Sequence, residues 1–85
     1  MELEYSRRFK KDLGKIKHVQ TRVQLQKLLE KLMARPYLGK PLSGKLSGLR
    51  SLRLPPYRII YRVEDDVIYL IDFGHRKDIY ERNNY

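Results

Sequence analysis

Three consecutive segments of strand-like sequence, joined by very short connections, constrain the fold of this chain more than any other feature. They span residues 49–54, 57–64 and 67–73, with only Pro55-Pro56 and Asp65-Asp66 between them. Proline cannot donate a ladder hydrogen bond and paired aspartates favour turns, so both connections interrupt the strands. Because two-residue connections leave no room for a crossover, neighbouring strands must pair antiparallel. The sequence therefore predicts a small antiparallel sheet made from these segments.

Arginines alternate with apolar residues along the predicted strands. Arg58 and Arg62 fall on alternate positions of residues 57–63, and the preceding segment carries Arg50 and Arg53. Successive side chains of a strand point to opposite faces of the sheet. We therefore expect the arginines of the paired strands to project together from one face, as a rigid cationic platform.

The beginning of the chain has the patterns of one strand and two helices. Residues 2–5 alternate polar and apolar side chains, and Ser6 is suited to cap a helix. Thr21 is suited to cap a second helix that extends to about Ala34 and ends before Pro36. The apolar stripe of the first helix consists of Phe9, Leu13 and Ile16.

Helices that precede hairpins predict a two-layer α+β domain, in which a short N-terminal strand is followed by an antiparallel helix pair that packs on the sheet. At 85 residues, the chain is expected to form a single domain over residues 1–85. Residues 37–48 contain three glycines together with Lys40 and Lys45, and we expect a long, positively charged loop there.

The basic charge is concentrated in one part of the chain. Residues 31–63 carry eight lysines and arginines and no carboxylate, whereas the rest of the chain has 11 basic and 10 acidic residues. A net charge of +9 predicts a polyanionic partner, such as nucleic acid, an anionic membrane surface or an acidic protein. The alternative is a domain that is basic for no binding reason.

The composition excludes some classes of protein. The chain has no cysteine, so disulfide frameworks and thiolate chemistry are excluded. No secretory signal pattern and no apolar run of membrane-spanning length is present. We therefore expect a cytoplasmic protein with no membrane partner. No group of histidines and carboxylates has metal-ligand spacing, and we expect chemistry without a metal or another cofactor.

Two stretches of the sequence resemble the RelE toxin family of the RelE/ParE superfamily. They are residues 42–63, LSGKLSGLRSLRLPPYRIIYRV, and residues 71–80, IDFGHRKDIY. The resemblance implies a microbial-ribonuclease-like fold and the toxin of a type II toxin–antitoxin system. It also implies a ribosome-dependent endoribonuclease (mRNA interferase) that a RelB-like antitoxin inhibits in a hetero-oligomer. ParE-like members, which share the fold and poison gyrase without cutting RNA, and a non-enzymatic RNA-binding module are the alternatives.

The resemblance also implies roles for single residues. Arg58 matches the arginine of the family's Tyr-Arg strand, Arg76 the arginine after the last strand, and Tyr80 the C-terminal tyrosine. Arg53 matches a strand arginine of the basic face. Ser51 departs from the family, because relatives carry a lysine there.

These residues suit cleavage of RNA by its own 2′-OH. Guanidinium groups match phosphate oxygens two at a time, so Arg58 and Arg76 are expected to clamp the anionic transition state. Tyr80 or His75 is expected to move the protons. A tyrosine hydroxyl has an ordinary pKa near ~10, which neighbouring cations can lower. The alternatives are structural: Tyr80 packs the tail on the sheet, and His75 hydrogen-bonds a loop.

The remaining cations of this region are expected to bind RNA phosphates and not to take part in the chemistry. The expected RNA-binding residues are Lys45, Arg50, Arg53 and Arg62. The sequence thus predicts one basic pocket at the sheet in which phosphate-binding arginines surround a tyrosine or a histidine.

Overall fold

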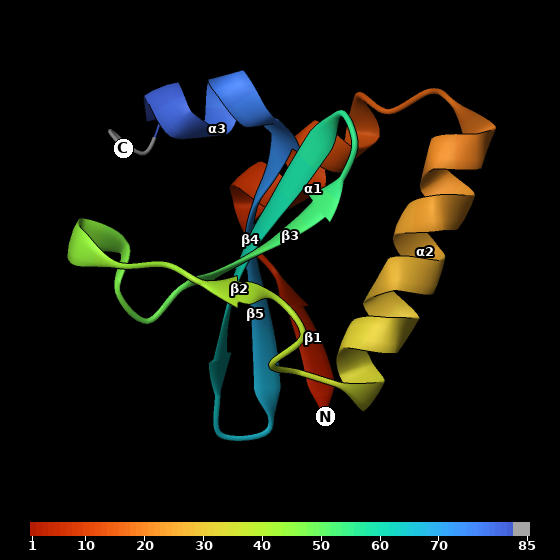
Figure 1. Cartoon of the computed structure of the whole chain (residues 1–85). Coiled ribbons are helices and arrows are strands. Elements are labelled where there is room, and N and C mark those ends of the chain that lie inside the picture. The colour runs from red at the N-terminus through yellow and green to blue at the C-terminus, as the bar shows by residue number, and fades with distance from the viewer. Residues whose placement is uncertain (83–85) are drawn as a thin grey trace.

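A five-stranded sheet, with helices packed against it, forms the fold in the computed structural model (Figure 1). The structure describes the backbone of residues 1–82 and the side chains of residues 1–79. The strand order across the sheet is β1-β5-β4-β3-β2. In chain order the elements are β1 (Glu2–Tyr5), α1 (Arg7–Gly14), α2 (Val19–Ala34), β2 (Lys40–Pro41), the 3-10 helix η1 (Gly44–Leu46), β3 (Arg50–Leu54), β4 (Tyr57–Glu64), β5 (Val67–His75) and α3 (Arg76–Arg82).

The predicted α+β class and the three-stranded antiparallel core of the sheet are confirmed. β3 pairs antiparallel with β4, and β4 with β5, as the short connections require. The sheet is nevertheless mixed and larger than expected, because β1 pairs with β5 in parallel and β2 pairs with the far side of β3. β1 and β5 lie at opposite ends of the chain with both helices between them, which leaves ample chain for a crossover.

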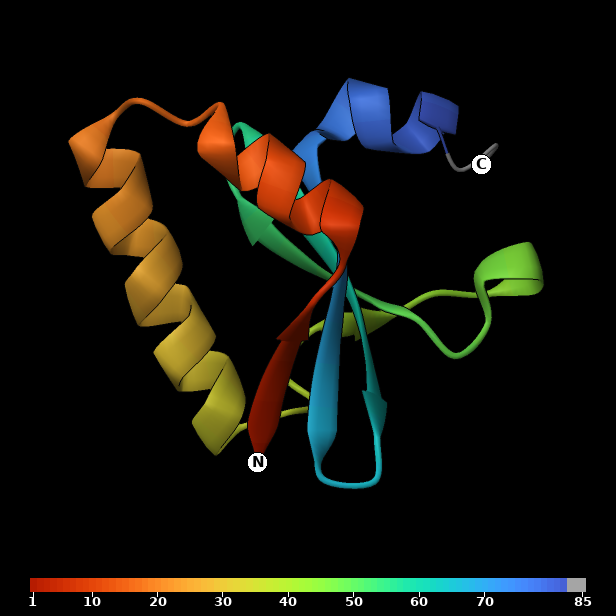
Figure 2. The ribbon, with the colours of Figure 1, turned by 180° about the vertical axis from the view of Figure 1, so that it is seen from behind.

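Helices α1 and α2 build the core against one face of the sheet, which we call the helix face. Figure 2 shows α1 crossing in front of the sheet and α2 standing beside it. Fully buried Phe9 and Leu32 from the two helices join Ile59, Tyr61 and Phe73 in one hydrophobic cluster. Burial of such side chains is worth about 1.5–3 kcal/mol each. This cluster fixes where the strand ends lie relative to α1.

The helix ends follow local chemistry only in part. Ser6 caps α1 as predicted, because its Oγ accepts a hydrogen bond from the Phe9 backbone N–H at 3.0 Å. The prediction that Thr21 caps α2 is wrong. The helix begins earlier, at Val19, and His18 occupies its N-cap position without a side-chain hydrogen bond to the helix.

Three elements were not expected from sequence. The segment predicted as an irregular loop contains β2 and η1, and the polar segment after β5 forms α3. α3 buries Ile79 completely, and this anchors the first turn of the helix to the sheet. In the part of the chain that the structure describes, no helix has the length and apolar character needed to cross a membrane.

Candidate functional site

Three arginines from different elements line one hollow at the end of the sheet, which we call the arginine hollow. Its volume is about 130 Å³, and its lining is Arg53, Pro55, Pro56, Tyr57, Arg58 and Arg76. The strand register explains why these arginines lie close together. Arg53 of β3 lies directly opposite Arg58 of β4, and Arg58 lies opposite Gly74 of β5. Arg76, the first residue of α3, follows Gly74 closely. The predicted grouping of Arg58 with Arg76 is therefore what the structure has.

The Arg58 guanidinium is held in place within this hollow. Its Nη1 donates a hydrogen bond of 3.0 Å to the Ser51 Oγ, and Ser51 is only 5% exposed. A charged donor that a buried acceptor already holds has little rotamer freedom left to lose on binding. This favours preorganised recognition of an anion. From sequence, Ser51 stands out only as a departure from the family. The signal that was available is its alternation with Arg53, which places both residues on the face that carries Arg58.

Placing Arg53 opposite Arg58 works against stability. Like charges directly opposite each other in an antiparallel pair destabilise a sheet by roughly 0.2–1 kcal/mol. Arg53 is exposed, so solvent screens part of this repulsion. A binding site for a phosphate group nevertheless requires cations that lie close together, as they do at this end of the sheet.

The expectation that Arg50 shares a face with Arg53 is wrong. The two residues are an odd number of positions apart, so strand alternation places them on opposite faces. Arg50 turns toward the connection after α2, where its Nη1 donates to the Gly39 carbonyl at 2.7 Å and the Tyr37 carbonyl at 3.2 Å. Its guanidinium carbon also lies 4.9 Å from the centre of the Tyr37 ring. Arg50 therefore ties down a loop, and a role in RNA binding stays a prediction.

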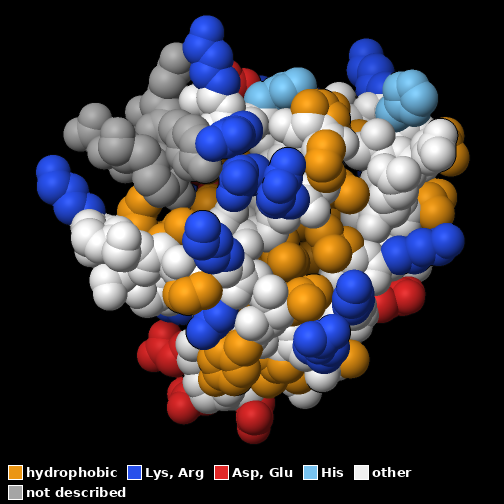
Figure 3. All heavy atoms as spheres, in the orientation of Figure 1, with side chains coloured by type: hydrophobic (Ala, Val, Ile, Leu, Met, Phe, Trp, Pro, Cys, Tyr) orange, Lys and Arg blue, Asp and Glu red, His pale blue; other side chains and the backbone are white. Residues whose placement is uncertain are grey.

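The other predicted RNA-binding residues lie outside the arginine hollow. Arg62 is exposed on the same strand as Arg58, 3.4 Å from the Glu64 carboxylate and 4.6 Å from the centre of the Tyr69 ring. Lys45 is exposed in η1. Figure 3 shows lysine and arginine side chains gathered over the middle of this face of the molecule, with carboxylates at its lower edge. This surface could track a phosphate backbone beyond the hollow.

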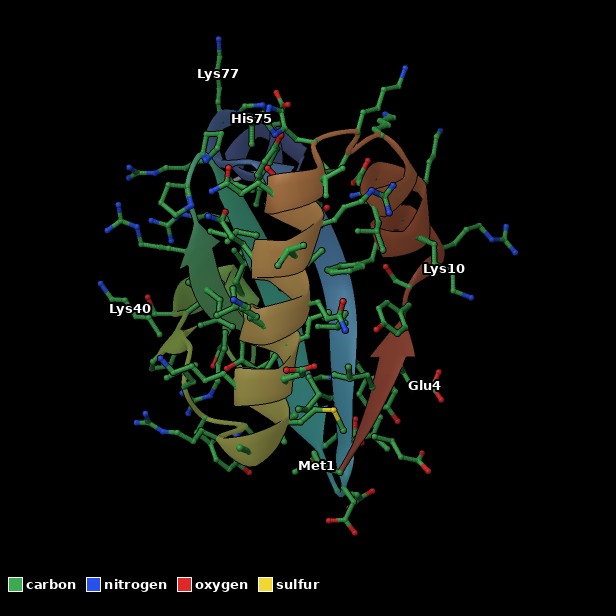
Figure 4. The ribbon with its side chains drawn as sticks, turned by 90° about the vertical axis from the view of Figure 1, so that its right-hand side faces the viewer. Met1, Glu4, Lys10, Lys40, His75 and Lys77 are labelled. Atoms are coloured by element: carbon green, nitrogen blue, oxygen red, sulfur yellow. The ribbon has the colours of Figure 1, made fainter. Side chains whose placement is uncertain are left out.

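His75 is not brought together with the arginines. It lies directly opposite Tyr57 in the β4–β5 register, and the centres of the two rings are 4.9 Å apart. Figure 4 places it at the end of the molecule remote from Met1, where β5 joins α3. It lines a second hollow of about 460 Å³, which we call the His75 hollow. The lining residues of this hollow are Asp12, Lys15, Ile16, Tyr57, Phe73, Gly74, His75 and Asp78.

The last predicted site residue, Tyr80, belongs to α3, but its side chain lies outside the described residues. Another tyrosine, Tyr61, is fully buried in the core and has a structural role. Its hydroxyl accepts a hydrogen bond from the Gly39 N–H at 2.7 Å and donates one to the Pro36 carbonyl at 2.9 Å. Burial raises the pKa of Tyr61, against the lowering effects of the Gly39 hydrogen bond and the Arg50 charge.

Comparisons with known proteins agree with this architecture. Residues 3–80 match a family model described as the ParE toxin of type II toxin–antitoxin systems. Toxin RelG from Mycobacterium tuberculosis is 40% identical over 47 residues, and the match covers 53% of this chain and 54% of RelG. The chain thus spans about half the length of this relative.

Two solved structures share nearly the whole fold. The toxin–antitoxin complex RelBE2 of Mycobacterium tuberculosis superposes with a TM-score of 0.70 and 27% identity, over 88% of this chain and 96% of that chain. The intact RelBE toxin–antitoxin complex of E. coli superposes with a TM-score of 0.73 and 25% identity, over 86% of this chain and 93% of that chain.

Proposed function

This chain belongs to the ParE toxin family of type II toxin–antitoxin systems, within the RelE/ParE superfamily, and on that premise we propose that it is a ribosome-dependent mRNA endonuclease. The observation that carries the proposal is the meeting of Arg53, Arg58 and Arg76 in one hollow. A scissile phosphate is the ligand that such a group of guanidinium forks recognises best.

In this proposal the RNA supplies its own nucleophile. The 2′-OH of one nucleotide attacks the adjacent phosphorus, a crowded anionic phosphorane forms, and the 5′-oxygen of the next nucleotide leaves. Arg58, held by Ser51, and Arg76 donate to the phosphorane oxygens. Stabilisation by one preorganised donor is typically worth ~3–4 kcal/mol of the barrier. The arginines supply this positive charge themselves, so the mechanism requires no metal ion.

Proton transfer is the second requirement of the reaction. One group removes the proton of the 2′-OH, and one group protonates the leaving oxygen. We assign one of these roles to Tyr80, which follows Arg76 by a single helical turn in α3. A tyrosine hydroxyl becomes a usable base when cations lower its pKa, and guanidinium groups are able to do this. His75 is the other candidate, although its ring faces the neighbouring hollow.

The partner in this proposal is a RelB-like antitoxin that inhibits the toxin by forming a hetero-oligomer with it. Both solved relatives described above are toxin–antitoxin complexes. A net charge of +9 would favour an acidic antitoxin segment over the arginine hollow, where it would compete with RNA. Co-purification of the chain with the product of the neighbouring reading frame, and loss of toxicity on co-expression, would support this pairing.

The test of the nuclease is message cleavage on translating ribosomes. Wild type should cut mRNA in the ribosomal A site, whereas Arg58→Ala combined with Arg76→Ala should leave the message intact. Lys27→Ala is the matched control, because it removes a cation from an exposed position of α2 far from both hollows in the sequence. Intact message in the presence of folded wild-type protein would overturn the proposal.

A ParE-like toxin without nuclease activity is the second candidate, and the description of the matching family model favours it. It would inhibit gyrase and would leave ribosome-bound message intact. A DNA supercoiling assay with purified gyrase therefore separates the two candidates. Gyrase inhibition without message cleavage would replace the nuclease by this second function.

A further inference from the structure

The His75 hollow has a size and a lining that the proposed chemistry leaves unused. Its volume of about 460 Å³ falls within the range of small-molecule sites, which is roughly 300–1,000 Å³. Of the residues that the structure describes, only Tyr57 lines both this hollow and the arginine hollow. The two hollows therefore lie on either side of one tyrosine, at the end of the sheet where β4 begins and β5 ends.

Aromatic rings form one wall of this hollow. Tyr57 stacks on the buried ring of Phe73, with 5.1 Å between ring centres and an interplanar angle of 27°. His75, which is exposed, also lies against Tyr57, with 4.9 Å between ring centres and an interplanar angle of 54°. Such a series of rings, fixed to the core at its inner end, offers a flat ligand a rigid surface with little loss of side-chain entropy.

Carboxylates form another part of the lining. Asp12 of α1 is 9% exposed, and its Oδ1 lies 3.8 Å from the Lys15 ammonium. Asp78 is exposed on the first turn of α3 and lines the same hollow. Because Lys15 already engages Asp12, Asp78 is the carboxylate placed to accept hydrogen bonds from a ligand. Two carboxylates against one ammonium make this hollow unsuitable for a phosphate, in contrast to the arginine hollow.

We propose that the His75 hollow binds a nucleobase that carries an exocyclic amino group, with the base against the Tyr57 and His75 rings and its amino group donating to Asp78. Carboxylates recognise amino groups of bases in this way, and unstacked RNA bases are commonly held on aromatic side chains. The inference rests on the proposed RNA-cleaving function: a strand with one phosphate against the arginines carries an adjacent base across Tyr57 into this hollow. The preference is for adenine, cytosine or guanine over uracil at that position.

Titration of the full chain with nucleosides tests the base site separately from the arginine hollow, because nucleosides carry no phosphate. The probes are adenosine, cytidine, uridine and purine riboside, which is adenosine without its amino group. The readout is the chemical-shift change of the backbone amides of Gly74, His75 and Lys15. Adenosine and cytidine should shift these amides and bind roughly ten-fold more tightly than purine riboside and uridine, respectively.

Variants assign the preference to named groups. Asp78→Ala, which leaves no side-chain acceptor for the amino group, should abolish the preference for adenosine over purine riboside. His75→Ala should weaken the binding of all four nucleosides by a similar factor. Arg53→Ala, on the far side of Tyr57, is the matched control and should leave nucleoside binding unchanged. Equal affinity for adenosine and purine riboside, or no shift of these amides with adenosine, would overturn the base site. If the chain cleaves message but does not bind adenosine, only the proposal of a base site is overturned. If it binds adenosine selectively but never cleaves RNA, only the nuclease proposal is overturned.

Discussion

Arg50 and Arg58 lie on adjacent strands of one sheet, and they serve different parts of the molecule. On the helix face, Arg50 donates to two carbonyls of the loop after α2 and so holds the fold together. On the opposite face, Arg58 is held by the Ser51 hydroxyl and lines the arginine hollow. Both residues contribute equally to the net charge. The comparison teaches that strand parity, and not the density of positive charge, separates a structural arginine from a candidate functional one.

The largest expected effect is on the rate of message cleavage, and it tests the contrast between Arg58 and Arg50 directly. Arg58→Ala should lower the single-turnover rate of message cleavage by ~10²–10³, because one preorganised donor to the phosphorane is lost. Arg50→Ala should lower the free energy of unfolding by about 1–2 kcal/mol, through its lost hydrogen bonds, with a far smaller change in that rate. Cleavage kinetics and urea unfolding of both variants measure the two effects. Equal rate losses in the two variants would abolish the distinction between the faces.

A glycine substitution tests how tightly the helix face is packed around Arg50. A Cβ on Gly39 would lie 2.7 Å from Cε1 and the hydroxyl oxygen of Tyr61, and 3.0 Å from the Ser51 carbonyl oxygen. Gly39→Ala should therefore destabilise the fold by about 1–3 kcal/mol in urea unfolding. Gly14→Ala is the control, because beyond the chain neighbours and the backbone of its own helix the added Cβ would meet no described atom within 4 Å. A tolerated Gly39→Ala would show that this side of the sheet adapts more easily than its contacts indicate.

On the face opposite the helix face, a substitution should change the free energy of unfolding in the opposite direction. Arg53→Gln removes a like charge directly opposite Arg58 and should raise the free energy of unfolding by roughly 0.2–1 kcal/mol. The same change should make the slope of log affinity for single-stranded RNA against log salt shallower by about 0.7. Lys27→Gln, with the same loss of charge elsewhere, controls for net charge. Destabilisation by Arg53→Gln would mean that Arg53 has a structural role like that of Arg50.

The smallest expected effect is a loss of stability at high pH, and it concerns Tyr61. Because burial raises its pKa above the ordinary value of 10.0, the folded chain retains a proton that the unfolded chain loses at lower pH. The corresponding stability is fully present below pH about 10 and is lost as the pH rises through the folded-state pKa. Urea unfolding of wild type between pH 8 and 11 should show this loss. Tyr61→Phe should be less stable than wild type at pH 8 and should lose less stability as the pH rises. If both proteins lose stability equally with rising pH, groups other than Tyr61 cause the loss.

Local patterns were sufficient for much of the sheet and for part of the site. The strand alternation of residues 57–63 correctly separated Tyr61 from Arg58, and the short connections correctly predicted the antiparallel order of β3, β4 and β5. The Ser6 cap also followed from its neighbours. The grouping of Arg58 with Arg76 came from resemblance to the toxin family, and the register of β4 with β5 accounts for it physically.

Other features depend on contacts between distant parts of the chain. The parallel pairing of β1 with β5 joins the two ends of the sequence, as does the hydrogen bond of 2.6 Å from the Ser6 hydroxyl to the Ile71 carbonyl. α3 was missed because its polar sequence has no apolar periodicity. Among the side chains of this helix that the structure describes, the buried one is Ile79, which anchors the first turn. His75 was predicted as an acid or base of the pocket that holds Arg58 and Arg76, but it lines the neighbouring hollow. A strand that passes into a helix turns successive side chains in different directions, so His75 and Arg76 diverge.

The sequence by itself determined the class of fold, the strand pairs that short turns enforce, and the identity of the residues able to bind an anion. These depend on alternation and turn chemistry, which act over a few residues. Only the tertiary structure decided that Arg53, Arg58 and Arg76 share one hollow, that Arg50 faces away, and that His75 lines another hollow with Asp12 and Asp78. These outcomes depend on strand register and on where the core places α1 and α3, which are set by packing between residues far apart in the chain.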